Sequence, residues 1–240
     1  MTFSEQQLPI GAGSAGTVEP RPAASAIVLR NDPFEVLFLR RSASSSFVPD
    51  AWIFPGGAVD PVDRRLAPRF GASEDAVMRL CAARELFEES GIWIGPALDA
   101  PQRRRERLLD DPGSFEDLVR TFPPRLDALM PTSRWITPAG VPKRYDTWFF
   151  LLAVEDGTEA TIENREGVDM AWLRPSAALE LHRGKSFPMV FPTIRNLMAI
   201  DGFSTRRELL ASREGIEIRP TCPRLVVEQG RTRIVLPDEP

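Results

Sequence analysis

The sequence predicts an α+β fold, because strands and helices are mixed along the chain without strict alternation of β and α. Short apolar runs typical of strands occur in both halves, and stretches with helical periodicity separate them. The 240 residues are 42% apolar and 27% charged, so the chain can build a sizeable core. No apolar run approaches the roughly 20 residues of a membrane-spanning helix.

The first strands are expected close to the N-terminus. Residues 24–29 and 35–39 have the composition of two strands joined by a turn at residues 31–33. Residues 52–54 then run into a Pro-Gly-Gly turn that ends at Gly57, where glycine lets the backbone approach another group closely.

The clearest helix lies between Ser73 and Gly91. Ser73 suits an N-cap and Gly91 stands where the residue after a helix often adopts a left-handed conformation. Leu80, Ala83 and Phe87 follow the i, i+3, i+7 spacing of one helix face, so we expect them to face the core. Short charged helices are expected over residues 101–130. Downstream we expect strands at residues 133–137, 147–154, 224–228 and 232–236, and helices near 175–183 and 192–200.

Composition excludes several classes of site. The single histidine rules out a metal site built from two or more histidines, and the two cysteines cannot form a disulfide scaffold, which favours a reducing compartment. A net charge of −4 gives no general attraction to nucleic acid or to an anionic membrane. We therefore expect neither as a partner, and any metal must be a hard cation held by carboxylates.

Three carboxylates share one face of the predicted helix. At about 100° per residue, Glu85, Glu88 and Glu89 fall within an arc of roughly 100° opposite the apolar positions. Like charges at this spacing repel each other, and a divalent cation such as Mg²⁺ would relieve the repulsion. Considered alone, the same pattern is equally well explained by a solvated acidic helix face.

The residues around these acids carry a family resemblance. Residues 84–92 resemble the second half of the Nudix box, G-x5-E-x7-R-E-U-x-E-E-x-G-U with U aliphatic, and match every fixed position of it. Residues 54–57, with the sequence Phe-Pro-Gly-Gly, resemble the strand and turn that open the box. The chain departs from the pattern in having 26 residues between Gly57 and Arg84 where the pattern has 13. Counting back from Arg84 places the family's first glutamate on Ala76.

The resemblance implies a Nudix α/β/α sandwich with a mixed sheet, helical insertions and a C-terminal extension. We expect a flexible tail over residues 1–20 and a Nudix domain over residues 21–183. Insertions are expected at about 58–73 and 101–130, and a C-terminal extension packed on the same domain at 184–240.

The resemblance also implies a mechanism. Glu85, Glu88 and Glu89 would hold Mg²⁺ or Mn²⁺, the Gly57 carbonyl would be an additional ligand, and Arg84 would orient a glutamate. The general base varies within the family and often lies in a later loop, where Glu163, Glu166 and Asp169 are the candidates here. Glu166 is best placed by resemblance, and a solvated loop acid is the alternative interpretation.

Residues 37–57 are similar to the coenzyme A signature of Nudix enzymes, L-L-T-x-R-[SA]-x3-R-x3-G-x3-F-P-G-G. The signature's threonine, second arginine and glycine are replaced by Leu39, Ser46 and Asp50. The lost arginine matters most, because arginine suits bidentate contacts with phosphate. We expect the substrate to contact Arg40, Arg41, Gly56, Gly57 and Arg144.

The predicted activity is metal-dependent hydrolysis of a diphosphate linkage in a nucleoside diphosphate derivative. Coenzyme A or acyl-coenzyme A is the favoured substrate, giving 3′,5′-ADP and 4′-phosphopantetheine. The alternatives are a diphosphatase for ADP-ribose, dinucleotides or other nucleotides, and a weakly catalytic nucleotide-binding module. A cytoplasmic location and, because many Nudix proteins pair through their sheets, a homodimer are the default expectations.

Overall fold

A computed structural model describes residues 18–43, 48–162, 167–228 and 231–237. The strands are β1 (Arg21–Arg30), β2 (Glu35–Arg41), β3 (Trp52–Ile53), β4 (Gly56–Ala58), β5 (Met130–Ile136), β6 (Tyr145–Ala153), β7 (Gly167–Leu173), β8 (Pro220–Thr221), β9 (Arg224–Glu228) and β10 (Arg231–Val235). The helices are α1 (Pro61–Leu66), α2 (Glu74–Ser90), α3 (Pro101–Asp110), α4 (Phe115–Thr121), α5 (Pro175–Arg183), α6 (Phe191–Ile200) and α7 (Arg206–Ala211). Short 3₁₀ segments occur at Ala67–Phe70, Pro112–Ser114 and Leu126–Ala128.

A mixed sheet forms the centre of the molecule. Its strands follow the order β3-β2-β1-β6-β5-β8, with β4 paired to β1 and β7 paired to β2. The long pairing of β1 with β6 is parallel, whereas β1 pairs antiparallel with both β2 and β4. β2 and β4 both pair with β1, at different positions along it. The sheet therefore splits between β2 and β4, and β4 lies beside helix α2.

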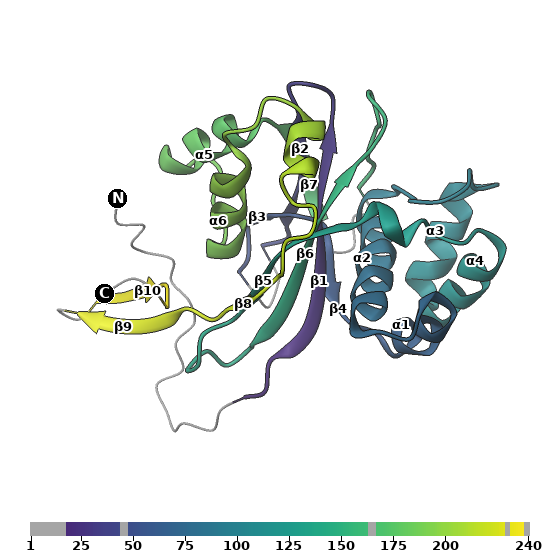
Figure 1. Cartoon of the computed structure of the whole chain (residues 1–240), viewed down its shortest axis with the longest axis horizontal. Helices are drawn as coiled ribbons and strands as arrows, with labels where there is room; N and C mark the ends of the chain where they lie inside the picture. The colour runs from purple at the N-terminus through teal and green to yellow at the C-terminus, as the bar shows by residue number, and fades with distance from the viewer. Residues whose placement is uncertain (1–17, 44–47, 163–166, 229–230, 238–240) are drawn as a thin grey trace.

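Helices cover both faces of the sheet, as Figure 1 shows. One buried cluster joins α2 and the helices α1, α3 and α4 to one face, and a second joins α5, α6 and α7 to the other. This arrangement confirms the predicted α/β/α sandwich of the α+β class. In the part of the chain described here, no helix is both long and apolar enough to cross a membrane.

Helix α2 follows the prediction closely. The Ser73 side chain accepts a hydrogen bond from the backbone of Ala76, and Gly91 ends the helix in a left-handed conformation with φ 71°. Leu80, Ala83 and Phe87 are fully buried. The helix is also buried on the side away from the sheet, where the segments predicted as insertions pack against it.

Candidate active site

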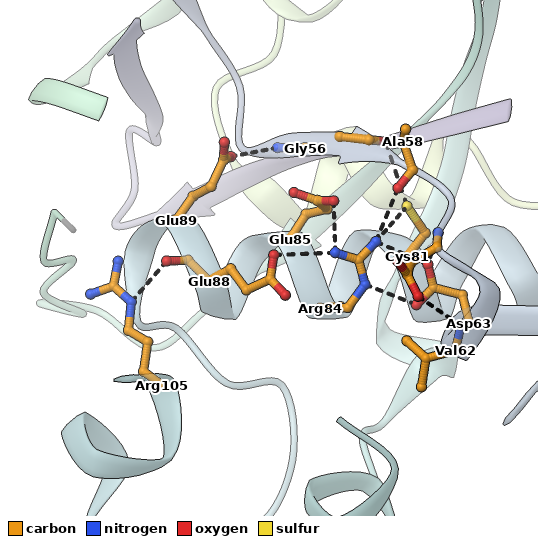
Figure 2. Close-up of polar contacts among 12 residues, drawn as sticks. Gly56, Ala58, Val62, Asp63, Cys81, Arg84, Glu85, Glu88, Glu89 and Arg105 are labelled. Atoms are coloured by element: carbon orange, nitrogen blue, oxygen red, sulfur yellow. Dashed lines mark hydrogen bonds and ion pairs between the residues drawn. The ribbon is translucent and has the colours of Figure 1, made fainter. Parts of the chain in front are cut away.

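The clustered glutamates of α2, Glu85, Glu88 and Glu89, are partly enclosed. Only 14% of the side chains of Glu85 and of Glu88 is exposed. A Glu89 oxygen accepts a hydrogen bond from the backbone N–H of Gly56 at 2.8 Å, which ties the helix to strand β4 (Figure 2). These contacts disfavour the interpretation of a solvated acidic face.

Arg84 lies at the centre of a buried polar network (Figure 2). It is 4% exposed, and one guanidinium nitrogen donates to Glu85 at 2.8 Å and to Glu88 at 3.1 Å. A second nitrogen donates to the Ala58 carbonyl at 3.0 Å. Burial alone would lower the pKa of Arg84, but the Glu85 charge and the hydrogen bonds that Arg84 donates to Asp63 outweigh burial and hold that pKa above its ordinary value. Arg84 therefore stays charged and fixes the orientation of two carboxylates.

Asp63, which sequence reasoning missed, is the partner of Arg84 on its other side. Its two oxygens accept from two guanidinium nitrogens, each at 3.0 Å, and its side chain is fully buried. Ala76, where the count back from Arg84 placed the family's first glutamate, is instead buried in the first turn of α2. Counting forward from Gly57 would have found Asp63, because five residues separate the two as in the pattern. The additional residues of the interrupted box therefore lie between Asp63 and Arg84.

Glu88 has an unusual proton affinity. Burial raises the pKa of Glu88 to about 7, and the neighbouring Glu85 charge adds to this rise, while Arg84 opposes it. A second positive charge beside these acids would favour the ionised form and lower that pKa. Binding of a cation near neutral pH would therefore release a proton from Glu88.

The donor set fits a hard divalent cation. Oxygens of Glu85 and Glu89 lie beside the backbone of β4, and a Cβ atom at Gly57 would come within 2.6 Å of the Glu85 carboxyl group. Carboxylate and carbonyl oxygens suit Mg²⁺ or Mn²⁺. The hydrogen bonds to Arg84 and to Gly56 hold the side chains apart, and within the described ranges no three acidic, histidine or cysteine side chains close a ligand cluster.

Cys81 has no features of a nucleophile. Its thiol is fully buried and donates to the Gly57 carbonyl at 3.5 Å. Burial raises the pKa of the Cys81 thiol well above its ordinary value, so the thiol remains protonated.

A cavity of about 720 Å³ opens beside the glutamates. Its walls include Glu85, Glu88 and Glu89. Gly56 and Gly57 of β4 and the predicted substrate residues Arg40 and Arg41 also line it. Arg21, Tyr145 and Trp135, which were not among the predicted substrate residues, also line it. Arg21 of β1 lies opposite Tyr145 of β6, and Trp135 of β5 lies opposite Thr147, two residues further along β6, so only the folded sheet brings them together.

Two predicted residues lie elsewhere. Arg144 donates to the backbone carbonyls of Thr137 and Val18 and is not among the residues that line the cavity. Asp169 is exposed on β7 and is likewise not a lining residue. Glu163, Glu166 and Ser46 lie outside the described residues.

Asp50 explains one departure from the coenzyme A signature. It stands where the signature has glycine and adopts a left-handed φ of 59°. Aspartate tolerates this conformation better than most side chains. Its carboxylate also accepts from Arg40 at 3.3 Å, so the substitution keeps the turn and anchors an arginine of the cavity.

The split sheet, the glutamate helix and the cavity beside β4 define the protein as a Nudix hydrolase. A family model described as "NUDT19 Nudix domain" matches residues 67–200, and the chain belongs to this family. It is 28% identical over 263 residues to the protein named "Acyl-coenzyme A diphosphatase NUDT19" of Gallus gallus, covering 83% of this chain and 68% of that one. It is also 28% identical to the Homo sapiens protein of that name, covering 77% of this chain and 66% of the other.

A solved structure confirms the fold. The chain resembles a crystal structure of a NUDIX hydrolase from Alicyclobacillus acidocaldarius with a TM-score of 0.73 and 27% identity. The match covers 82% of this chain and 97% of that chain. Members of the Nudix family typically use divalent metal ions, in agreement with the donor set described above.

Proposed function

We propose that this protein hydrolyses the diphosphate linkage of coenzyme A or acyl-coenzyme A to 3′,5′-ADP and (acyl-)4′-phosphopantetheine. The observation that carries the proposal is the set of enclosed glutamates fixed by Arg84 at the wall of a cavity that also presents arginines. Relatives named as acyl-coenzyme A diphosphatases, at 28% identity, support this choice of substrate.

Glu85, Glu88 and Glu89 would hold Mg²⁺ or Mn²⁺, with the Gly57 carbonyl as an additional ligand. When bound, the metal would polarise the diphosphate and activate water for attack on phosphorus. Arg84 fixes the carboxylates of Glu85 and Glu88, and the Gly56 N–H fixes that of Glu89. This preorganisation spares the site a rearrangement of charge during the reaction.

The general base is proposed to be Glu166. Ile162 and Gly167, on the two sides of the segment that contains it, both line the cavity. In this role Glu166 would take a proton from the attacking water, as the family resemblance implies. Exchange of Glu166 for glutamine is expected to reduce kcat while leaving metal affinity unchanged, which separates a base from a metal ligand.

Arg40 and Arg41 are proposed to contact substrate phosphates. Both line the cavity at the end of β2, and guanidinium groups bind phosphate through paired hydrogen bonds. A diphosphatase for ADP-ribose or for dinucleotides is the second candidate, favoured by Ser46 where the coenzyme A signature has an arginine.

The test is a substrate panel with Mg²⁺ or Mn²⁺ that contains coenzyme A, acetyl-coenzyme A, ADP-ribose, NADH and oxidised nucleoside triphosphates. Products are identified by mass. Release of 4′-phosphopantetheine is the expected result. Cleavage of ADP-ribose or NADH alone would transfer the proposal to the second candidate, and retention of a nucleotide without hydrolysis would indicate a binding module.

A further inference from the structure

The cavity is divided by charge. Among the described residues that line it, the charged ones all lie between Arg21 and Glu89 in the sequence. The C-terminal segment contributes Val190, Phe191, Pro192, Thr193, Pro223 and Ile234, none of which is charged. The charged side chains of the lining are therefore suited to phosphates, and the lining from the C-terminal segment is suited to an uncharged group.

The sheet sets the distance between these walls. Ala58 of β4, Ala23 of β1, Thr147 of β6 and Trp135 of β5 lie opposite one another in a single row, and all four line the cavity. Neighbouring strands are about 4.8 Å apart, so three steps separate β4 from Trp135 by about 14 Å. Arg40 and Arg41 lie at the end of β2, outside the row that leads to Trp135.

The apolar wall is built on a fixed contact between β5 and α6. Trp135 meets Phe191 edge-to-face, with ring centroids 5.8 Å apart. Ser133, two residues before Trp135, donates to Asn196 in the middle of α6 at 2.6 Å and so holds this helix on the sheet. The aromatic pair is thus preformed rather than assembled by a ligand.

We propose that Trp135 and the C-terminal wall around Phe191 bind the acyl end of an acyl-coenzyme A substrate and determine its preferred chain length. This inference rests on the proposed function. An acyl-coenzyme A has charged phosphates and an uncharged arm that ends in an apolar chain, which matches the charged and uncharged walls. Each methylene buried there multiplies affinity by about fourfold.

The experiment measures kcat/KM for decanoyl-coenzyme A relative to acetyl-coenzyme A. Phe191→Trp reduces the room in the wall and is expected to lower this ratio about tenfold, since it displaces one or two methylenes. Phe191→Ala enlarges the wall and shifts the preferred chain to a longer one. Phe203→Trp is the matched control, because Phe203 packs just beyond the other end of α6 without lining the cavity, and it should keep the wild-type ratio.

A binding measurement separates recognition from chemistry. With EDTA present, the dissociation constants of decanoyl-coenzyme A and of coenzyme A are compared by calorimetry, and Phe191→Trp should weaken the first more than the second. Thermal unfolding checks each variant, and Trp135→Phe provides a second probe of the wall. Equal changes for both ligands, or an unchanged ratio in both Phe191 variants, would overturn the inference while leaving the proposed function intact. Failure of the wild-type protein to cleave any coenzyme A ester would overturn both.

Discussion

Exchange of Asp63 for asparagine should destabilise the protein strongly. Asp63 is fully buried and accepts two hydrogen bonds from Arg84, so the exchange leaves a buried guanidinium without one of its counter-charges. Breaking a buried ion pair from one side costs about 3–5 kcal/mol. Since Arg84 keeps its bonds to Glu85, Glu88 and the Ala58 carbonyl, we expect the lower end, about 3 kcal/mol.

The assay is urea or thermal unfolding of the metal-free protein. For a chain of this size, about 3 kcal/mol corresponds to a fall in Tm of about 6–12 °C. Asp117→Asn is the matched control, because Asp117 pairs with Arg107 and Arg120 at the surface and should cost less than about 1 kcal/mol.

The same variant should also weaken metal binding. Without Asp63, the Arg84 charge falls more fully on Glu85 and Glu88 and competes with a cation for them. A stability of Asp63→Asn within about 1 kcal/mol of wild type would refute the claim that this pair holds Arg84 in place.

Four further predictions concern contacts in and around the site. Because the pKa of Glu88 is about 7 in the metal-free protein, Mg²⁺ affinity should fall by up to tenfold per pH unit below pH 7, as calorimetry at pH 8, 7 and 6 would show. The stabilising effect of protonated Glu88 on the metal-free fold is complete below about pH 4.5 and is lost as the pH rises through about 7. Loss of this pH dependence of the free energy of unfolding in a Glu88→Gln variant would confirm that Glu88 causes it. Gly57→Ala should reduce turnover more than stability, since the new methyl group would displace the Glu85 carboxylate, and unchanged kcat would contradict this contact. Arg105→Lys should cost about 2–3 kcal/mol in unfolding assays, because the buried Arg105 donates to the Glu88 carbonyl and to Thr161, and wild-type stability would refute that role.

Much of the site could be predicted from the sequence because it lies within one helix. Ser73 and Gly91 mark the ends of α2 through local capping, and helical periodicity alone places three glutamates opposite the apolar positions. The strands β1, β2 and β6 also follow from short apolar runs, since these sequences favour strands without help from distant residues.

The rest depends on contacts between distant segments. The pairing of Asp63 with Arg84 spans 21 residues, and the count back from Arg84 misplaced it because the additional residues fall between the two. Helices α1 and α7 are only six residues long, so their periodicity is too short to be recognised. Trp135 and Phe191 meet only through the packing of α6 on β5, which no local pattern records.

Glu85, Glu88 and Glu89 are proposed to make this protein a metal-dependent diphosphatase, and the variant Glu89→Gln removes one of these carboxylates. Glutamine keeps an oxygen to accept the Gly56 N–H but removes the charge that would hold the metal. With Mg²⁺ and acyl-coenzyme A, we expect kcat/KM to fall at least about a hundredfold while Tm is retained. The control Glu106→Gln, on the exposed side of α3, should retain wild-type turnover. Equal turnover in Glu89→Gln and wild type would contradict the role of Glu89 in holding the metal.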